Sequence, residues 1–517
     1  MTMKKTSLHP EATGVPAELS PLKSLAFDVP AGLVVFLVAL PLCLGIALAS
    51  GAPLLSGLVA GIVGGLVIPL VSRSALSVCG PAAGLATLVL AGILQAGSFE
   101  SFCVAVVLAG LLQLVLGLCR AGRLVAFFPS SVIKGMLAAI GVLLIFKQLP
   151  YALGLPGGKL EFPASGLEWS ALAIGLLSLA LIIGWDKARP KALGLIPGAL
   201  LAVVAATLLS ELLRWTQPEL ALSQAFLVTL PIDGPQSLLS QLRAPDWSAL
   251  RSPDTWVLAL TLGVVASLET LLSLEAVDKM DPYHRRTPLN RELVAQGLGN
   301  SVSGLLGGLP ITSVIVRSTA NVHAGARTRA STMVHGALLL GTVMLAAGLL
   351  NRIPLASLAA ILLVTGYKLA NPALFQTMHR LGWSQFGPFV ATLGAILATD
   401  LLKGILVGIV VSVAFTLRNA MREPYTLRHE GERYVLQLKQ DVYFFNKAAL
   451  LEALEKMPEG ARVIIDGSAS SFIDHDVLEV LASFDRLASR KNIQLEVREL
   501  RQMPVVGSAG GLPLAAR

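Results

Sequence analysis

Long apolar runs follow one another along most of this 517-residue chain, and they constrain its fold more than any other feature. Hydrophobic residues make up 54% of the sequence and charged residues only 14%, a balance that ordinary soluble domains do not have. A membrane-spanning helix needs about 20 apolar residues, and runs of that kind recur from residue 28 to residue 420. The runs are 29–50, 55–71, 102–118, 132–146, 171–184, 194–209, 256–276, 333–350, 355–364, 388–399 and 405–417. Hydropathy therefore predicts a helical membrane protein with about ten to fourteen spans.

The distribution of charge predicts how these spans are oriented. The net charge is +8, but Lys and Arg gather in every second connection between the apolar runs. The connections in between, around Gly97, Gly157 and Asn351, contain almost no Lys or Arg. By the positive-inside rule, this pattern predicts cytoplasmic amino and carboxyl termini, and so an even number of spans. We expect a multi-pass protein of the bacterial inner membrane whose surroundings are the lipid bilayer, with no nucleic-acid partner.

The composition changes to that of a soluble domain after Arg422. Alternating patterns predict strands at 434–438, 463–466 and 494–497 and helices at 447–457 and 476–489. This alternation is typical of a small α/β domain with parallel strands. We expect four parts: a cytoplasmic segment 1–24, a transmembrane transport domain 25–422, an α/β domain 423–502 and a disordered tail 503–517.

Two segments interrupted by Gly and Pro are the best indication of a binding site. They are SVCGPAAG at 77–84 and GGLPITS at 307–313, and each leads into a helix too short to cross about 30 Å of hydrocarbon. Paired half-helices direct free N–H groups and positive dipole ends at one point, which attracts an anion. We expect the N–H groups of residues 80–84 and 312–316 to face one cavity. The alternative is that Gly and Pro only allow close helix packing.

Ionisable residues inside the apolar runs are the next candidates. Glu269 lies deep in the run 256–276, where a carboxylate is costly unless it is paired, protonated or hydrated. Ser273 follows one turn later on the same face, so the two side chains are candidates to bind a proton or Na⁺. The alternative for Glu269 is a structural ion pair. Arg317 falls inside the second short helix, where it either adds positive charge beside the anion or extends to the membrane edge.

Several classes of protein are disfavoured. The sequence has no Walker A loop, GxSxG, HExxH or Cys–His metal cluster, so we expect neither an enzyme nor a bound cofactor other than Na⁺ as a coupling ion. A nucleobase permease would need polar groups where Val314, Ile315 and Val316 stand.

An ordered series of motifs covers nearly the whole chain. They are FDVPAGL at 27–33, GIALASG at 45–51, SVCGPAAG at 77–84, GNSVSG at 299–304, RSTAN at 317–321, GARTR at 325–329, VIIDG at 463–467 and FIDHD at 472–476. This series resembles the SulP family, the sulfate-permease-like anion transporters that include prestin and pendrin. The last two motifs resemble the STAS domain that follows the membrane part in that family.

The resemblance implies an all-α membrane domain of fourteen segments in two inverted repeats of seven, divided into core and gate, with an elevator-like movement of the core. It implies that the third and tenth segments are half-helices with the anion between their amino termini, and that the protein forms a homodimer to which the STAS domain contributes. The candidate anion-binding residues are Cys79, Gly80, Pro81, Ala82, Ala83, Thr312, Ser313, Val314, Ile315, Val316 and Arg317. The candidate coupling-ion residues are Glu269 and Ser273.

Departures from the family pattern bear on the substrate. Leu42 stands where sulfate-transporting members often carry Gln, and the stretch 36–53 resembles bacterial members often associated with carbonic anhydrase. We therefore expect bicarbonate, carried by secondary active symport with Na⁺ or H⁺. Ala82 replaces a Thr of sodium-coupled members, which leaves the choice of cation open. The alternatives are a transporter or exchanger of sulfate, another anion or a dicarboxylate, and a passive anion channel.

Overall fold

The computed structural model describes residues 21–122, 128–155, 168–188, 197–230, 232, 238, 240–399, 401–420, 424–431 and 433–499. The expected tail 503–517 and all but the last four residues of the expected segment 1–24 lie outside these ranges. The chain divides into two compact units, Met1–Ile409 and Val410–Arg517, each considered by itself.

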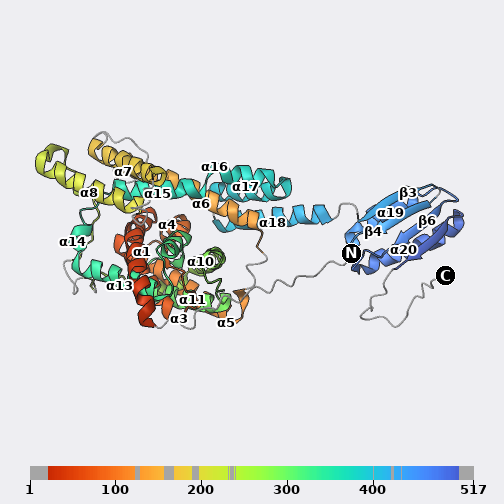
Figure 1. Cartoon of the computed structure of the whole chain (residues 1–517), viewed down its shortest axis with the longest axis horizontal. Coiled ribbons are helices and arrows are strands. Elements are labelled where there is room, and N and C mark those ends of the chain that lie inside the picture. Colours follow the sequence, from red (N-terminus) through yellow and green to blue (C-terminus); the bar gives the residue numbers. More distant parts are fainter. Residues whose placement is uncertain are drawn as a thin grey trace, which may run out of the picture. The chain divides into compact units, whose positions relative to one another are not determined.

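Helices are the main elements of the described part of the first unit (Figure 1). They are α1 (Pro21–Ala49), α2 (Leu54–Leu66), α3 (Ile68–Val71), α4 (Ala86–Ala96), α5 (Phe99–Leu118), α6 (Ser130–Ala152), α7 (Trp169–Ala188), α8 (Gly198–Thr216), α10 (Pro253–Met280), α11 (Leu289–Leu305), α12 (Ile315–His323), α13 (Ala330–Leu345), α14 (Ala347–Leu350), α15 (Leu355–Leu369), α16 (Pro372–Arg380) and α17 (Trp383–Ala398), and α18 (Leu401–Ala420) begins in this unit. Nine described helical segments are long and apolar enough to span a membrane, and Ala83–Ala96 and Ala330–Leu345 are shorter apolar helices. The predicted multi-span helical domain is confirmed.

The helices of this unit form two sets that pack mainly among themselves (Figure 1). One set contains α2, α5, α10, α11, α12 and α13, and the other contains α6, α7, α8, α15 and α17. Helix α1 packs against both sets, on α13 and α2 in the first and on α15 and α8 in the second. The two interrupted segments both belong to the first set.

Glycines allow α5 and α11 to approach until their backbones touch. A methyl group on Gly297 would lie 2.6 Å from the Leu114 nitrogen and 2.7 Å from the Gly110 oxygen. A methyl group on Gly110 would in turn lie 2.5 Å from the Ser301 nitrogen. Small residues at such crossings are how membrane helices gain van der Waals contact without a hydrophobic driving force.

A buried aspartate fixes α1 to the loop before α13. Asp28 is fully buried, and its Oδ1 accepts hydrogen bonds from the backbone nitrogens of Arg327 at 2.7 Å and Thr328 at 3.0 Å. The Thr328 hydroxyl donates to Oδ2 at 2.5 Å. These three donors satisfy a charge that would otherwise be costly to bury. Two of the motifs seen in the sequence therefore meet here.

The second unit contains a four-stranded sheet in the order β3–β4–β6–β8. Its elements are β3 (Tyr425–Glu430), β4 (Arg433–Leu438), β5 (Asp441–Val442), η8 (Phe444–Asn446), α19 (Lys447–Glu455), β6 (Arg462–Asp466), β7 (Phe472–Ile473), α20 (His475–Arg490) and β8 (Gln494–Arg498). Strands β4, β6 and β8 are parallel, and β3 pairs antiparallel with β4. The predicted small α/β region is confirmed, while strand β3 was not predicted.

We predict that Gly297→Ala will lower the stability of the first unit by about 1–3 kcal/mol, because the added methyl group forces α5 and α11 apart. The matched control is Gly394→Ala in α17, where nothing lies within 4 Å of the added methyl group. Thermal unfolding of the purified proteins in detergent measures the difference. Equal unfolding temperatures for the two variants would contradict the close contact.

Candidate functional site

The two interrupted segments meet in a short antiparallel sheet inside the first unit. Strand β1 (Cys79–Pro81) pairs with β2 (Ile311–Ser313), with Gly80 opposite Thr312, and both strands are buried. Strand β1 continues into the single turn η1 (Ala83–Leu85) and then α4, and β2 continues into α12. The starts of two short helices therefore lie beside one shared sheet.

Hydrogen bonds beyond the sheet join the first segment to α12. The hydroxyls of Ser77 and Ser313 are 2.6 Å apart, and the nitrogen of Val78 donates to the Ser318 hydroxyl at 2.9 Å. The side-chain amide of Asn321 donates to the Leu76 oxygen at 2.9 Å. Residues 76–78 are thus held against β2 and α12.

Arg317 is buried beside this sheet, in the first turn of α12. Its Nη2 donates to the Pro81 oxygen at 3.3 Å, and its Nη1 occupies the space that a side chain at Gly80 would need. Among the described residues neither Nε nor Nη1 meets a hydrogen-bond acceptor, although the Cys43 thiol interacts with the guanidinium. A fully buried Arg317 does not extend to the membrane edge. Its charge adds to the positive amino end of α12.

Polar side chains that sequence analysis missed support the sheet from behind. Asn300 accepts from the Ile311 nitrogen at 2.6 Å and donates to the Ile311 oxygen at 3.1 Å, and Gln113 accepts from Asn300 at 2.7 Å. Thr270 of α10 accepts from the Ser313 nitrogen at 3.3 Å. Gln296 donates to the Cys79 sulfur at 3.0 Å. The spacing of Gln296 and Asn300, one turn apart on the same face of a helix, was the available signal.

The structure brings most of the predicted anion-binding residues together, but not all. Cys79, Gly80, Pro81, Ala82, Thr312, Ser313 and Arg317 are buried in one cluster, and Ala83 and Val314 are half-buried at its edge. The side chains of Ile315 and Val316 are 43% and 55% exposed, outside this cluster. Only their backbone N–H groups remain candidates for contact with a ligand.

Glu269 of α10 lies against the start of the first half-helix. Its Oε1 is 2.6 Å from the position that a methyl group on Gly84 would take, and the residue is half-buried. Within the described ranges its carboxyl has no hydrogen-bond or ion-pair partner, so no structural ion pair accounts for it there. Ser273 is buried one turn further along the same face. In the part of the chain that the structure describes, no cluster of three His, Cys, Asp or Glu residues surrounds a metal position.

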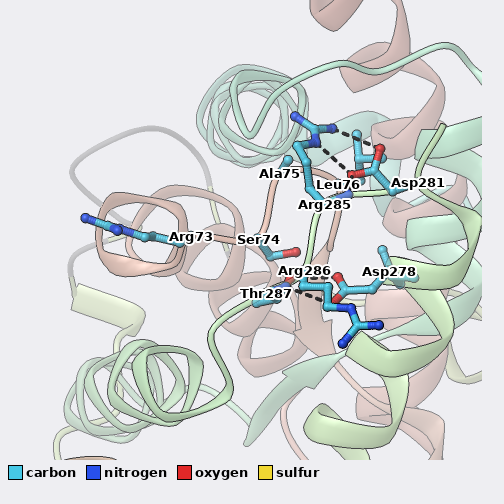
Figure 2. A pocket seen from close by; sticks show the side chains of 10 residues that line it. Arg73, Ser74, Ala75, Leu76, Asp278, Asp281, Arg285, Arg286 and Thr287 are labelled. Atoms are coloured by element: carbon cyan, nitrogen blue, oxygen red, sulfur yellow. Dashed lines mark hydrogen bonds and ion pairs between the residues drawn. The ribbon is translucent and has the colours of Figure 1, made fainter. Parts of the chain in front are cut away.

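A polar pocket lies at the carboxyl end of α10, as Figure 2 shows. Asp281 forms an ion pair with Arg285 at 2.7 Å, and Asp278 accepts hydrogen bonds from the nitrogen and hydroxyl of Thr287 at 2.8 and 2.7 Å. These carboxylates thus bind groups in the turn that follows α10, and the contacts hold that turn in place.

Comparisons with known proteins agree on one family. Residues 25–392 match the model of the sulfate permease family. A putative sulfate transporter of Bacillus subtilis, YvdB, is 27% identical over 93% of both chains. The bicarbonate transporter BicA of Picosynechococcus is 28% identical over 76% of this chain and 70% of its own length. The solved structure of SLC26A9 superimposes with a TM-score of 0.75 at 17% identity, covering 92% of this chain and 85% of that one.

We predict that Gly80→Ala will displace the Arg317 guanidinium and weaken binding of a small anion by about tenfold, the value of one charged hydrogen bond. Because the displaced group is the flexible end of a side chain, the fold should be kept. The control is Gly341→Ala in α13, which meets nothing within 4 Å. Added sulfate or bicarbonate should raise the unfolding temperature, and the size of this rise measures anion binding. A rise in Gly80→Ala as large as that in the wild type would argue against the role of Arg317.

Proposed function

Because this chain belongs to the sulfate permease family, and is therefore a multi-pass anion transporter and not an enzyme, we propose that it is a secondary active transporter of bicarbonate. The paired starts of α4 and α12 beside a buried Arg317 support this proposal most directly. Free N–H groups at helix starts bind anions, and the guanidinium adds a full charge to the same place.

The choice of bicarbonate rests on the sequence. Leu42 and the stretch 36–53 have the character of bicarbonate-type members, and a named bicarbonate transporter is among the relatives. A relative named as a putative sulfate transporter has nearly the same identity, 27% against 28%, and covers more of this chain, 93% against 76%, so sulfate is the second candidate. Two further alternatives are a transporter or exchanger of another anion or a dicarboxylate, and a passive anion channel.

The movement that we propose is an elevator-like displacement of one helix set against the other. The set that contains α2, α5, α10, α11, α12 and α13 carries the whole candidate site and would be the core; the set around α6, α7, α8, α15 and α17 would be the gate. In this proposal residues 25–422 comprise fourteen segments in two inverted repeats of seven.

Several further features belong to the same proposal. The STAS-like region, 423–502, would take part in a homodimer in the inner membrane, with both termini in the cytoplasm as the alternation of basic connections indicates. Such a transporter would be functionally associated with a carbonic anhydrase that produces or consumes bicarbonate.

Coupling to a cation is the role that we propose for Glu269. A carboxylate inside the membrane that has no ion-pair partner among the described residues becomes neutral by taking up a proton or binding Na⁺. Either event adds positive charge near the anion, so that cation and anion favour each other's binding, as symport requires. Ser273 offers a hard oxygen ligand for Na⁺, whereas Ala82 has none, so both cations remain candidates.

Proteoliposomes that contain the full-length protein test the substrate directly. We expect uptake of labelled bicarbonate that exceeds uptake of labelled sulfate and increases with an inward Na⁺ or H⁺ gradient. Single-channel current steps would identify a passive channel, because a carrier produces none. Faster uptake of sulfate than of bicarbonate would transfer the assignment to sulfate, and uptake indifferent to both gradients would exclude symport.

Replacement of Glu269 tests the coupling. We predict that Glu269→Gln, which keeps the volume and removes the charge, abolishes the dependence of uptake on the driving cation and lowers gradient-driven uptake by at least about tenfold. The control is Glu275→Gln on the same helix, where the glutamate is exposed and paired with Lys279 at 2.7 Å. If a well-folded Glu269→Gln protein kept the Na⁺ and pH dependence, Glu269 would have a structural role only.

A further inference from the structure

His335 of α13 is fully buried and has no part in the transport scheme above. Within the described ranges, neither of its ring nitrogens, Nδ1 and Nε2, meets a hydrogen-bond partner. A buried polar atom without a partner is costly, so an exception of this kind points to a ligand or to ordered water. The contacts that the structure describes thus do not account for this side chain.

Contacts on either side of His335 place this part of α13 against the candidate site. About one turn before it, the Thr332 hydroxyl donates to the Ser77 oxygen at 3.3 Å, in the segment that leads into β1. Immediately after it, the Cα of Gly336 is 2.6 Å from the position that a methyl group on Gly65 of α2 would take. At the level of His335, α13 therefore packs on α2 and on the start of the first interrupted segment.

The next turn of α13 leads to the guanidinium of Arg317. The Cδ1 of Leu339, one turn after His335, lies 2.9 Å from the position that a methyl group on Gly61 would take, and the Cys43 sulfur lies 2.7 Å from the same position. The Cys43 thiol in turn interacts with Arg317, and Arg317 also acts electrostatically on His335 itself. The imidazole and the guanidinium thus belong to one buried region.

The free polar atoms of these two residues form a defined set of donors and acceptors. Arg317 contributes donors only, from Nε and Nη1, and neither atom has an acceptor among the described residues. A neutral imidazole contributes one N–H donor and one acceptor nitrogen. The neutral ring is the form that fits this position, because a second positive charge near a buried guanidinium is repelled. A ligand that matches the set is an anion with several acceptor oxygens and one hydroxyl group.

We propose that His335 is a specificity-determining residue that accepts a hydrogen bond from the hydroxyl group of a protonated oxyanion bound by Arg317. This inference rests on the proposed function and deepens it. Bicarbonate has one O–H group, so its other oxygens can accept from the guanidinium while the hydroxyl donates to His335. Sulfate and nitrate have acceptor oxygens only, and either ion would leave the acceptor nitrogen of His335 without a donor.

Two other buried acceptors without a partner lie in the same set of helices. They are the side-chain oxygens of Asn321 in α12 and Gln296 in α11. The amide nitrogens of these residues already donate, to the Leu76 oxygen and the Cys79 sulfur respectively. His335 differs from both because neither of its polar atoms is used among the described residues. It alone offers a free donor together with a free acceptor in this part of the structure.

Nitrate provides the test, because it is planar and monovalent like bicarbonate but has no O–H group. Uptake of labelled bicarbonate by the full-length protein in proteoliposomes is measured with unlabelled nitrate or unlabelled bicarbonate as the competitor. We expect the wild type to need about tenfold more nitrate than bicarbonate for half-inhibition, because nitrate leaves a buried acceptor unpaired. Equal half-inhibitory concentrations of the two anions would overturn the inference.

Replacement of His335 assigns this discrimination to one residue. His335→Phe removes both ring nitrogens and should bring the two half-inhibitory concentrations to within about twofold of each other. His335→Gln keeps one donor and one acceptor in its amide and should retain the preference for bicarbonate. The matched control is His323→Phe at the carboxyl end of α12, where the histidine is exposed. A residue that only stabilises the fold would weaken both competitors alike and leave their ratio unchanged.

An unchanged ratio in His335→Phe would therefore overturn the inference and assign the discrimination to another acceptor, while leaving bicarbonate transport intact. If His335→Phe does not fold, His335→Met removes the same polar atoms with a more flexible side chain, and an unchanged ratio in that variant has the same meaning. Absence of labelled bicarbonate uptake by the wild type would overturn the proposed function and this inference with it.

Discussion

Inside a membrane, every backbone N–H and C=O group must find a hydrogen-bond partner within the protein, and this requirement governs the structure. A continuous helix meets that requirement by itself, but the segments around Gly80 and Thr312 are interrupted and do not. They satisfy part of this need by pairing as β1 and β2, and the nitrogens of Val78, Ile311 and Ser313 donate to Ser318, Asn300 and Thr270. Because this pairing ends where α4 and α12 begin, it also brings two helix starts to one place. The same strand pairing that satisfies backbone groups thus forms the candidate anion site.

Close packing of the surrounding helices maintains that arrangement. The backbone contact of α5 with α11 at Gly110 and Gly297 positions Asn300 and Gln296 behind the sheet. Asp28 connects α1 to the loop that leads from α12 to α13. These contacts tie the elements of the site into one set of helices, which is the property that a moving core would need.

The balance of charge determines what such a site can do. Arg317 and the helix starts attract an anion, whereas Glu269 provides a carboxyl group on the side of α10. In the proposed scheme Glu269 links the anion to a cation. A site with positive charge alone would bind its substrate and keep it.

The sequence by itself determined the membrane class, the helical character of the first unit and the α/β character of the second, because hydropathy and strand alternation are local properties. It also located both interrupted segments, since Gly and Pro break helices wherever they occur in such runs. It did not identify Asn300, Gln296 or Thr270, whose roles depend on which backbone groups face them. Nor did it separate Arg317, which is buried, from the exposed Val316 beside it. Strand β3 was missed because its alternating polar residues gain their strand partner only from β4. Such features depend on contacts between segments distant in the chain, so only the tertiary structure decides them.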